Sequence, residues 1–518
     1  MPLLLSSDAA EQLRTHAEAR IGALDAPGIA VAVTGTDGDE SLLAVGHADL
    51  AETPLGPDHR FEIGSISKSF AAICVLQLER EGALSLDDKL VQHVPWFRVR
   101  GGHGPITLRH LLMHRSGLPV GAEPGPSSPA HIAELADAQT EWEPGARFWY
   151  SNVGYDALGY ALELRSGLPL PELIGRRVLA PLGMSASSAH IAPEDRRLLA
   201  DGHERLHPHL PRHPSRSQLA TAPFTVSEGA SGSIVSNAGD MARYVRHLLG
   251  RGPAGFDEMI DGLPDDEGIP YGLGLAITER GGHQVVGHSG GMVGYVAQML
   301  CDMDAGIGAI ALSNGPSGAR TVAEYALDLA RAERDGADLP DPPGDPAIDL
   351  SAYAGRYGPI TVSESGIEAG GVAGTLFEHA TDTYATDHPE MCETFIHFGR
   401  SEGERVDHLI AGDVWHPAAE YAGPTEFAHP PQWDAYPGLY RSHNPWFPAA
   451  RVTLCRGELA VEQPDYGRMP LLAHPTGGFA TGTPEGRLPE RYRFDTVVDG
   501  RAQRMDVGGC RLYRAMRS

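Results

Sequence analysis

A stretch rich in aspartate and proline, residues 335–346, divides this 518-residue chain into two parts with different patterns of apolar residues. Before it, segments of helical and strand-like periodicity alternate, which indicates a mixed α/β domain. After it, short alternating runs broken by glycine and proline indicate all-β structure. We therefore expect a first domain over 1–334, a linker over 335–348 and two β domains over 349–425 and 433–518.

The first part is expected to fold as an antiparallel sheet flanked by helices, with a helical subdomain. Apolar residues recur at helical spacing in three long segments and at alternate positions in several short ones. The expected helices cover 7–24, 67–81, 108–113, 155–165 and 319–334. The expected strands cover 28–34, 42–47, 272–277, 284–287, 293–300 and 306–313.

The two expected β domains share a short repeated segment. Tyr353-Ala-Gly-Arg-Tyr357 reappears as Tyr436-Pro-Gly-Leu-Tyr440, 83 residues further on. A repeat at this distance suits two small barrels of similar design, each beginning with the same strand. Chance similarity remains the alternative for so short a match.

Charge and cysteine content narrow the classes of partner and compartment. The formal net charge of −27 argues against nucleic acid and anionic membranes, which both attract basic surfaces. The five scattered cysteines are typical of buried thiols rather than of a disulfide framework. The first residues resemble no signal peptide and no apolar run is long enough to span a membrane, so we expect a cytoplasmic protein.

Lysine is almost absent, and its positions are informative. Two of the 41 basic residues are lysines and the other 39 are arginines. Lys68 follows Ser65 by one helical turn, so the two side chains can reach each other. Unlike arginine, a buried lysine can lose its proton, so Lys68 is a candidate base beside a candidate nucleophile. The alternative is that Ser65 merely caps a helix.

A second candidate segment is Tyr150-Ser-Asn152. A tyrosine held near a lysine ammonium has a lowered pKa and can transfer protons. Asn152 could fix the lysine and a substrate amide by hydrogen bonds. Taken alone, the segment is more typical of a turn with a buried tyrosine; it gains significance together with Ser65 and Lys68.

Two further motifs are present but disfavoured. His203-Glu-Arg-Leu-His207 matches a zinc-protease pattern, yet the prolines that follow it exclude the continuous helix that such a site needs. The segment 287–291 matches a nucleophile elbow around Ser289, but the residues after it alternate like a strand instead of forming a helix.

Three motifs, and their order along the chain, resemble those of the serine β-lactamase and penicillin-binding protein superfamily. The resemblance is to its class C-like branch, which includes D-aminopeptidases and esterases. They are Ser65-Ile-Ser-Lys68, Tyr150-Ser-Asn152 and His288-Ser-Gly290. The resemblance covers about residues 20 to 330, and the two trailing β domains look like the lipocalin-like barrels of the D-aminopeptidases. His288 stands where most β-lactamases have a lysine, which puts recognition of a substrate carboxylate in doubt.

The resemblance implies an enzyme mechanism and a site. Ser65 would form an acyl-enzyme, Lys68 and Tyr150 would share the role of general base, and Asn152 and His288 would orient the groups. The oxyanion would be bound near Gly290 and Gly291 and by the N–H of Ser65. No metal or organic cofactor is implied.

The preferred activity is that of a D-aminopeptidase or amidase on small D-residue peptides or amides. An esterase, a D,D-carboxypeptidase, a weak β-lactamase or a peptide-cyclising thioesterase would use the same scaffold. A non-catalytic acylatable sensor or a ligand-binding protein is the alternative of another class. The expected partners are a small peptide, amide or ester substrate, and a homodimer is possible.

Overall fold

A computed structural model describes residues 4–24, 26–121, 128–213, 218–250, 252, 256–264, 268–316, 318–344, 348–401, 403, 405–464, 466–483 and 486–516. The chain forms two compact units. The first contains Met1–Arg205 and Leu219–Pro343, and the second contains Leu206–Gln218 and Gly344–Ser518. None of the helices in these ranges is both long and apolar enough to cross a membrane.

The first unit is built on an eight-stranded antiparallel sheet in the order β2-β1-β12-β11-β10-β9-β8-β7. Early and late parts of the chain pair with each other inside this sheet, because Ile29 of β1 pairs with Ser313 of β12. The strands are β1 Gly28–Gly35, β2 Glu40–Gly46, β7 Leu263–Pro264, β8 Pro270–Tyr271, β9 Ala276–Arg280, β10 His283–Met292, β11 Tyr295–Asp302 and β12 Ile307–Ser313.

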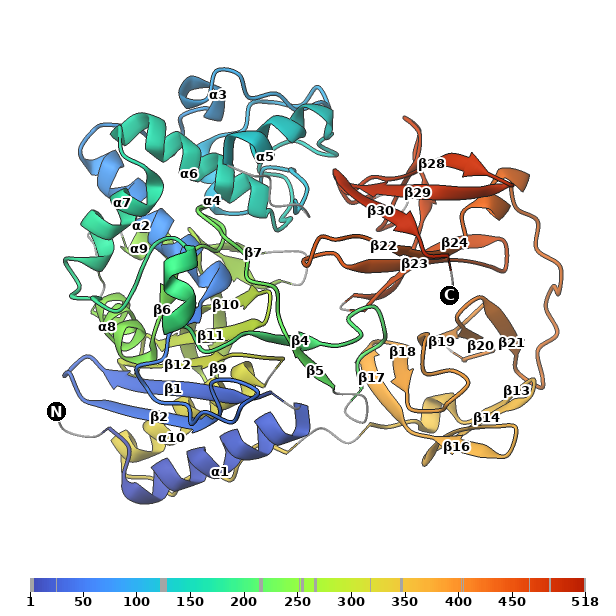
Figure 1. The fold of residues 1–518 in the computed structure, drawn as a ribbon, viewed down its shortest axis with the longest axis horizontal. Coiled ribbons are helices and arrows are strands. Elements are labelled where there is room, and N and C mark those ends of the chain that lie inside the picture. Colours follow the sequence, from blue (N-terminus) through green and yellow to red (C-terminus); the bar gives the residue numbers. More distant parts are fainter. Residues whose placement is uncertain are drawn as a thin grey trace. The chain divides into compact units, whose positions relative to one another are not determined.

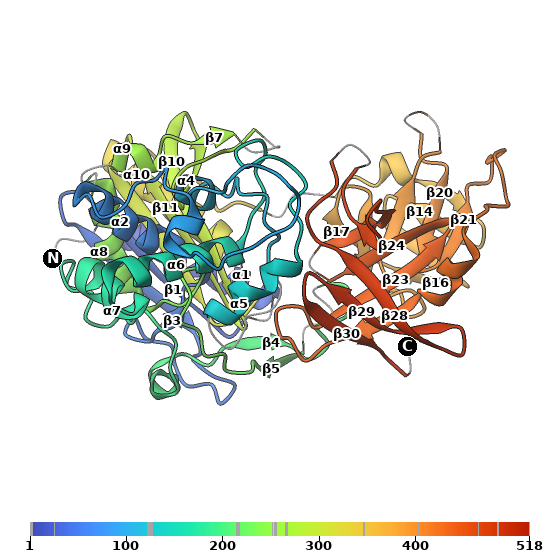
Figure 2. The same ribbon diagram turned by 90° about the horizontal axis from the view of Figure 1, so that it is seen from above.

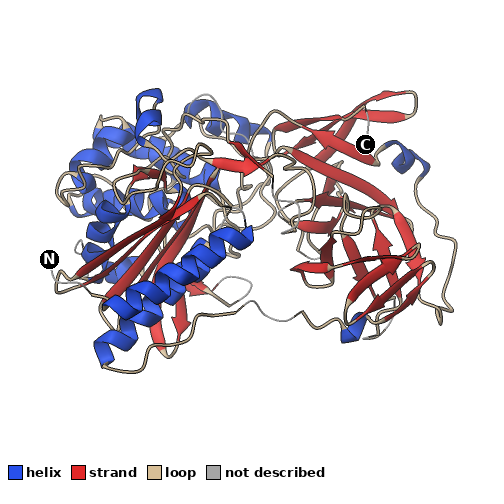
Figure 3. Ribbon diagram, turned by 60° about the horizontal axis from the view of Figure 1, so that its bottom comes forward, coloured by secondary structure: helices blue, strands red, loops and turns tan. Residues whose placement is uncertain are grey.

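Alternate residues of β1 face two different apolar cores. Ile29, Val31 and Val33 pack in one core with helices α1 (Ser7–Leu24) and α10 (Ala319–Asp335). Ala30 and Ala32 pack in the other with α2 (Ser67–Arg80) and α8 (Ala238–Leu249). Because successive side chains of a strand point to opposite faces, both faces of the sheet are covered by helices. Figures 1 and 3 show this layering.

Short helices form the predicted helical subdomain over the α2 side of the sheet. They are α3 Leu90–His93, α4 Leu108–Leu112, α5 Ser128–Glu134, α6 Asn152–Ser166 and α7 Leu170–Ile174. Helix α6 begins three residues before the predicted start at 155. The reason is local: the Ser151 hydroxyl accepts a hydrogen bond from the Gly154 N–H at 3.0 Å and so caps the helix at Asn152.

The predicted strand 272–277 is wrong in its first half. Gly272 donates its N–H to the Leu275 carbonyl at 2.9 Å, and Gly274 has φ +79°. These residues form a turn that glycine tolerates, so β9 begins only at Ala276. The other predicted strands of this sheet are present, with ends shifted by a few residues.

The second unit is all-β apart from short 3₁₀ turns in its described residues, and nine of its strands form a nearly closed barrel (Figure 2). Their order is β25-β24-β23-β22-β30-β29-β28-β27-β26, and the edge strands β25 and β26 are separated in the chain only by Leu471. The strands are β22 Gly438–Arg441, β23 Ala449–Cys455, β24 Glu458–Gln463, β25 Gly467–Pro470, β26 Leu472–Ala473, β27 Phe479–Ala480, β28 Tyr492–Val498, β29 Arg501–Val507 and β30 Cys510–Arg514.

In the preceding part of the unit, strands that are neighbours in the chain again pair with each other, but they form two separate sheets. The orders are β13-β14-β15-β16 and β17-β18-β19-β20-β21. An isolated bridge between Tyr357 and Ala418 joins them, so a second barrel stays a prediction. They are β13 Gly355–Tyr357, β14 Ile360–Ser363, β15 Gly366–Ala369, β16 Val372–Gly374, β17 Leu376–Ala380, β18 Thr383–Thr386, β19 Ile396–Gly399, β20 His408–Ala411 and β21 Val414–Pro417.

The repeated tyrosine segment has the same structure in both places. A 3₁₀ turn precedes β13 and β22, and in each case the second tyrosine hydroxyl donates to the carbonyl of the first. The distances are 2.8 Å from Tyr357 to Tyr353 and 2.6 Å from Tyr440 to Tyr436. The five cysteines of the chain are all buried and none forms a disulfide, as predicted.

Candidate active site

Ser65 lies in a single 3₁₀ turn, Gly64–Ile66, which leads directly into α2. Strand β3 (Phe61–Glu62) precedes the turn, and Gly64 takes φ +54°, a conformation that glycine adopts without strain. Neither the turn nor α2 has a hydrogen bond from a capping side chain. The alternative prediction, that Ser65 only caps a helix, is therefore wrong. Its hydroxyl lies instead 3.0 Å from Lys68 Nζ.

Lys68 is fully buried, and its Nζ has three oxygen neighbours. They are Ser65 Oγ at 3.0 Å, Asn152 Oδ1 at 2.8 Å and the Ser231 carbonyl at 2.6 Å. Burial lowers the pKa of Lys68 to about 7, and the charge of Asp156 opposes part of this shift. A large share of the lysine is therefore neutral at neutral pH.

The neutral form of Lys68 has a defined hydrogen-bond arrangement. A neutral amine carries two hydrogens and one lone pair. The Asn152 and Ser231 oxygens can only accept, so they take the two hydrogens. The lone pair is left for the Ser65 hydroxyl, which can act as a donor. The geometry thus suits transfer of the Ser65 proton to Lys68.

Tyr150 lies against the same lysine, at the start of α6. The centre of its ring is 4.8 Å from Lys68 Nζ, and the Tyr155 ring centre is 5.4 Å from it. The Ser151 N–H donates to His114 Nδ1 at 3.0 Å, and the His114 and Tyr150 ring centres are 4.1 Å apart. His114 therefore supports the segment that carries Tyr150 and Asn152.

His114 has no predicted role in the sequence, although it lies within residues 20 to 330, over which the chain resembles the superfamily. It is fully buried and adopts φ +53°. Burial, with the nearby charges of Lys68 and His288, holds the pKa of His114 well below its usual value. A neutral His114 can accept the Ser151 N–H through Nδ1.

His288 lies on β10 and is held neutral. Its pKa is lowered to about 4, first by burial and then by the charge of Lys68. The Ser289 carbonyl can only accept, so Nδ1 carries the hydrogen and donates to it at 2.5 Å. Nε2 then accepts the hydroxyl hydrogen of Tyr271 at 2.9 Å. The ring centres of His288 and Tyr150 are 6.2 Å apart.

Tyr271, on β8, is a site residue that the sequence did not indicate. We expect Tyr271→Phe to leave the fold intact and to lower kcat/KM about 5- to 10-fold, since one hydrogen bond that fixes the His288 ring is lost. Steady-state kinetics with the best amide substrate checks this. Tyr325→Phe removes a hydroxyl from α10 and serves as the matched control; equal losses in both variants would contradict a role for Tyr271.

The end of β10 runs close to the turn that carries Ser65. A Cβ on Gly290 would meet the Ile63 carbonyl oxygen at 1.9 Å, and one on Gly64 would meet the Gly291 nitrogen at 2.7 Å. Only glycine permits this approach. The backbone around Gly290 and Gly291 therefore lies beside the nucleophile's turn, where the resemblance expects the oxyanion to bind.

The two disfavoured motifs do not form the sites they imitate. His203 begins strand β4 (His203–Arg205), which pairs with β5 (Leu219–Thr221), so the zinc-protease helix is absent there. Ser289 lies inside β10, which is followed by β11 and not by a helix. Both results agree with the predictions.

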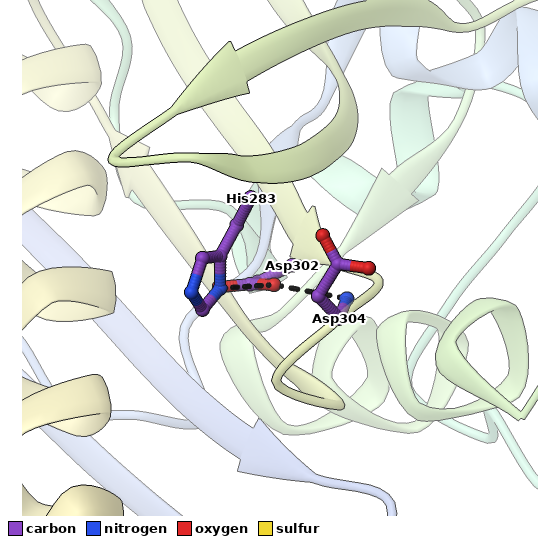
Figure 4. A group of neighbouring side chains, drawn as sticks. All are labelled: His283, Asp302 and Asp304. Atoms are coloured by element: carbon purple, nitrogen blue, oxygen red, sulfur yellow. Dashed lines mark hydrogen bonds and ion pairs between the residues drawn. The ribbon is translucent and has the colours of Figure 1, made fainter.

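Another polar group, His283, Asp302 and Asp304, has the donor atoms of a cation site (Figure 4). Asp302 is buried, and the Arg331 guanidinium donates to its Oδ2, which also lies 2.9 Å from His283 Nδ1. The N–H groups of Asp304 and Ala305 donate to its Oδ1. Since these donors already satisfy and neutralise the carboxylate, we assign no metal to this group.

The chain is similar to several known proteins. Residues 13–333 match the family described as Beta-lactamase. The chain is 29% identical to penicillin-binding protein 4* of Bacillus subtilis over 345 residues, covering 60% of this chain and 74% of that protein. It is 28% identical to the D-aminopeptidase of Brucella anthropi over 344 residues, 59% of each protein.

A solved structure extends the likeness. The octameric penicillin-binding protein homologue from Pyrococcus abyssi superposes with a TM-score of 0.58 at 25% identity, covering 79% of this chain and 99% of that one. The family match spans more than half of the chain and includes all three motifs. The protein therefore belongs to the β-lactamase family.

Proposed function

We propose that the protein is a serine hydrolase that acts through an acyl-enzyme on Ser65 and releases N-terminal D-residues from small peptides or amides. One observation supports the hydrolase most strongly: the buried Lys68 amine, bonded to two pure acceptors, keeps its lone pair for the Ser65 hydroxyl. A binding protein needs no such arrangement. Members of this superfamily are serine hydrolases, and the D-aminopeptidase among the relatives favours a D-amide substrate.

The proposed reaction has two halves. Ser65 Oγ attacks the substrate carbonyl while its proton passes to Lys68. Tyr150 and Lys68 then deliver a proton to the departing amine, and the acyl group stays on Ser65. Water attacks this ester and gives a proton to the same pair, which passes it to Ser65 Oγ as the acid departs. The Ser65 and Gly291 N–H groups bind the oxyanion, and each such donor typically contributes about 3–4 kcal/mol.

The protonation state of His288 affects which class of substrate the site can bind. A histidine with a pKa of about 4 carries no charge at pH 7 and offers no cation to a free substrate carboxylate. A neutral His288 therefore favours substrates that end in an amide or an ester. It disfavours the substrates of a D,D-carboxypeptidase, which have a free C-terminal carboxylate that the enzyme must bind. An esterase and a thioesterase remain compatible with the same geometry.

A substrate panel tests the proposal. It compares D- and L-alanine amide, D-alanine p-nitroanilide, a D-alanyl-D-alanine peptide, a p-nitrophenyl ester and a chromogenic cephalosporin. We expect turnover of the D-amides, at least tenfold faster than of the L-forms. An adduct on Ser65 that forms but does not turn over would indicate an acylatable sensor instead. Preference for the ester with no amide turnover would indicate an esterase.

The assembly and the division of the β region also stay predictions. A homodimer is one possible assembly, and light scattering of the purified chain measures its mass. The boundaries 335–348, 349–425 and 433–518 can be checked by limited proteolysis, which cuts preferentially in exposed linkers.

A further inference from the structure

A buried histidine–aspartate pair lies next to the loop that contacts the lysine. Asp156 is on α6, one turn after Asn152, and His131 is on α5; each is only 7% exposed. His131 Nδ1 donates to Asp156 Oδ2 at 3.1 Å. The other oxygen, Oδ1, accepts the Ser231 N–H at 3.2 Å. Both carboxylate oxygens therefore have a partner.

Ser231 connects this pair to Lys68. Its N–H binds Asp156 and its own carbonyl accepts from Lys68 Nζ at 2.6 Å. The approach of this loop depends on Gly229, where a Cβ would meet Asp156 Oδ1 at 2.4 Å. Moving the Asp156 carboxylate would therefore move one of the two acceptors that orient the Lys68 hydrogens.

Asp156 also has an electrostatic effect on Lys68. Its negative charge raises the pKa of Lys68, against the larger lowering by burial. Three other titratable groups that face the lysine bring no negative charge at neutral pH: His114 and His288 are neutral, and burial raises the pKa of Tyr155 well above its usual value. The fourth such group is the half-buried Tyr150, whose ring centre lies 4.8 Å from Lys68 Nζ.

We propose that Asp156, oriented by His131, is a positioning residue for the catalytic lysine. Its carboxylate holds the Ser231 peptide against Lys68 and sets the pH range in which the lysine can accept the Ser65 proton. This inference rests on the proposed hydrolase function, because it assigns the lysine's role as base. It adds a pair of residues that none of the three motifs contains.

Asp156→Asn separates the two effects. The amide oxygen can still accept the Ser231 N–H, but the negative charge is gone. Burial then acts on Lys68 unopposed, its pKa falls, and more of it is neutral in acid. We expect the acid limb of kcat/KM to move about one pH unit lower, the usual size for removal of a neighbouring charge.

Asp240→Asn is the matched control. Asp240 is another buried carboxylate of the same unit, in the first turn of α8, where it accepts from Ala186 N–H and pairs with Arg243. Asp240→Asn removes one negative charge, as Asp156→Asn does, but at a position away from Lys68. We expect its acid limb to coincide with that of the unmodified protein.

A second readout does not depend on activity. Protein labelled only at lysine gives two side-chain NMR signals, and Lys89→Arg identifies which one is Lys68. In Asp156→Asn the Lys68 pKa should fall by about one pH unit, as the acid limb does. An unchanged Lys68 pKa in the folded variant would overturn the inference, whatever the kinetics show.

A fallback variant covers failure of Asp156→Asn to fold. His131→Ala removes the hydrogen bond that orients the Asp156 carboxylate, so the carboxylate is held less firmly near Lys68 and the Lys68 pKa should shift in the same direction by a smaller amount. No shift there would overturn the inference. If Lys68 shifts as expected while neither the unmodified protein nor any variant hydrolyses a compound of the panel, the proposed function fails, and the part of the inference that stands is the control of the Lys68 pKa by Asp156.

Discussion

Replacing Ser65 by alanine is expected to lower kcat at least 10⁴-fold, because it removes the proposed nucleophile, whose Oγ lies 3.0 Å from Lys68 Nζ. Ser65 is only partly buried and packs little side-chain volume, so the variant should fold normally. Initial rates with the best D-amide measure the loss. Mass spectrometry of quenched reactions should find the acyl group on the Ser65 peptide in the unmodified protein and no adduct in the variant.

Ser289→Ala is the control for this prediction. Ser289 stands in the sequence of a nucleophile elbow, yet it is exposed on a strand. We expect this variant to keep activity within about twofold, the range of a neutral surface change. Full activity in Ser65→Ala together with loss in Ser289→Ala would replace the assignment of the nucleophile.

The second large effect concerns Lys68→Arg. Arginine keeps the positive charge but cannot release its proton at ordinary pH, so it cannot receive the Ser65 proton. We expect kcat to fall about 10²- to 10⁴-fold, the usual contribution of a general base. The small Lys68 amine also fits between the three oxygen atoms around it better than the larger guanidinium of arginine would. Rates from pH 5 to 10 measure the loss, which should persist throughout.

Lys89→Arg makes the same chemical change at an exposed position, the cap of α3, and should leave the rate unchanged. The chain thus offers both of its lysines as test and control. A Lys68→Arg variant within tenfold of the unmodified rate would show that the lysine only supplies charge, and that Tyr150 alone takes the proton.

The parts of the site that depend on local spacing were predictable from the sequence. Lys68 reaches Ser65 because the two are one helical turn apart, and α2 follows its apolar periodicity. Ser151 also gave a usable signal for the start of α6, since serine is a preferred cap, but the prediction placed the helix start at Tyr155. The prediction of a strand starting at Gly272 was wrong because two glycines turn the chain there.

The residues that support the site were not predictable in this way. Tyr271 on β8 reaches His288 two strands away on β10, and His131 reaches Asp156 from another helix, so each contact is created by packing of separate elements. A lone tyrosine or histidine is also more often part of a core than of a site. The all-β nature of the second unit followed from its alternating pattern, whereas closure of a barrel depends on strand registers that the pattern does not specify.

Titration of the Lys68 side chain in lysine-labelled protein tests the central claim most directly, since the whole mechanism requires an amine that is neutral beside Ser65. With two lysines in the chain, the Lys68 signal can be followed from pH 5 to 11 without overlap. The account predicts a pKa of about 7. A pKa near the ordinary value of 10.5 would mean that Lys68 stays an ammonium at neutral pH, and would contradict its role as the base.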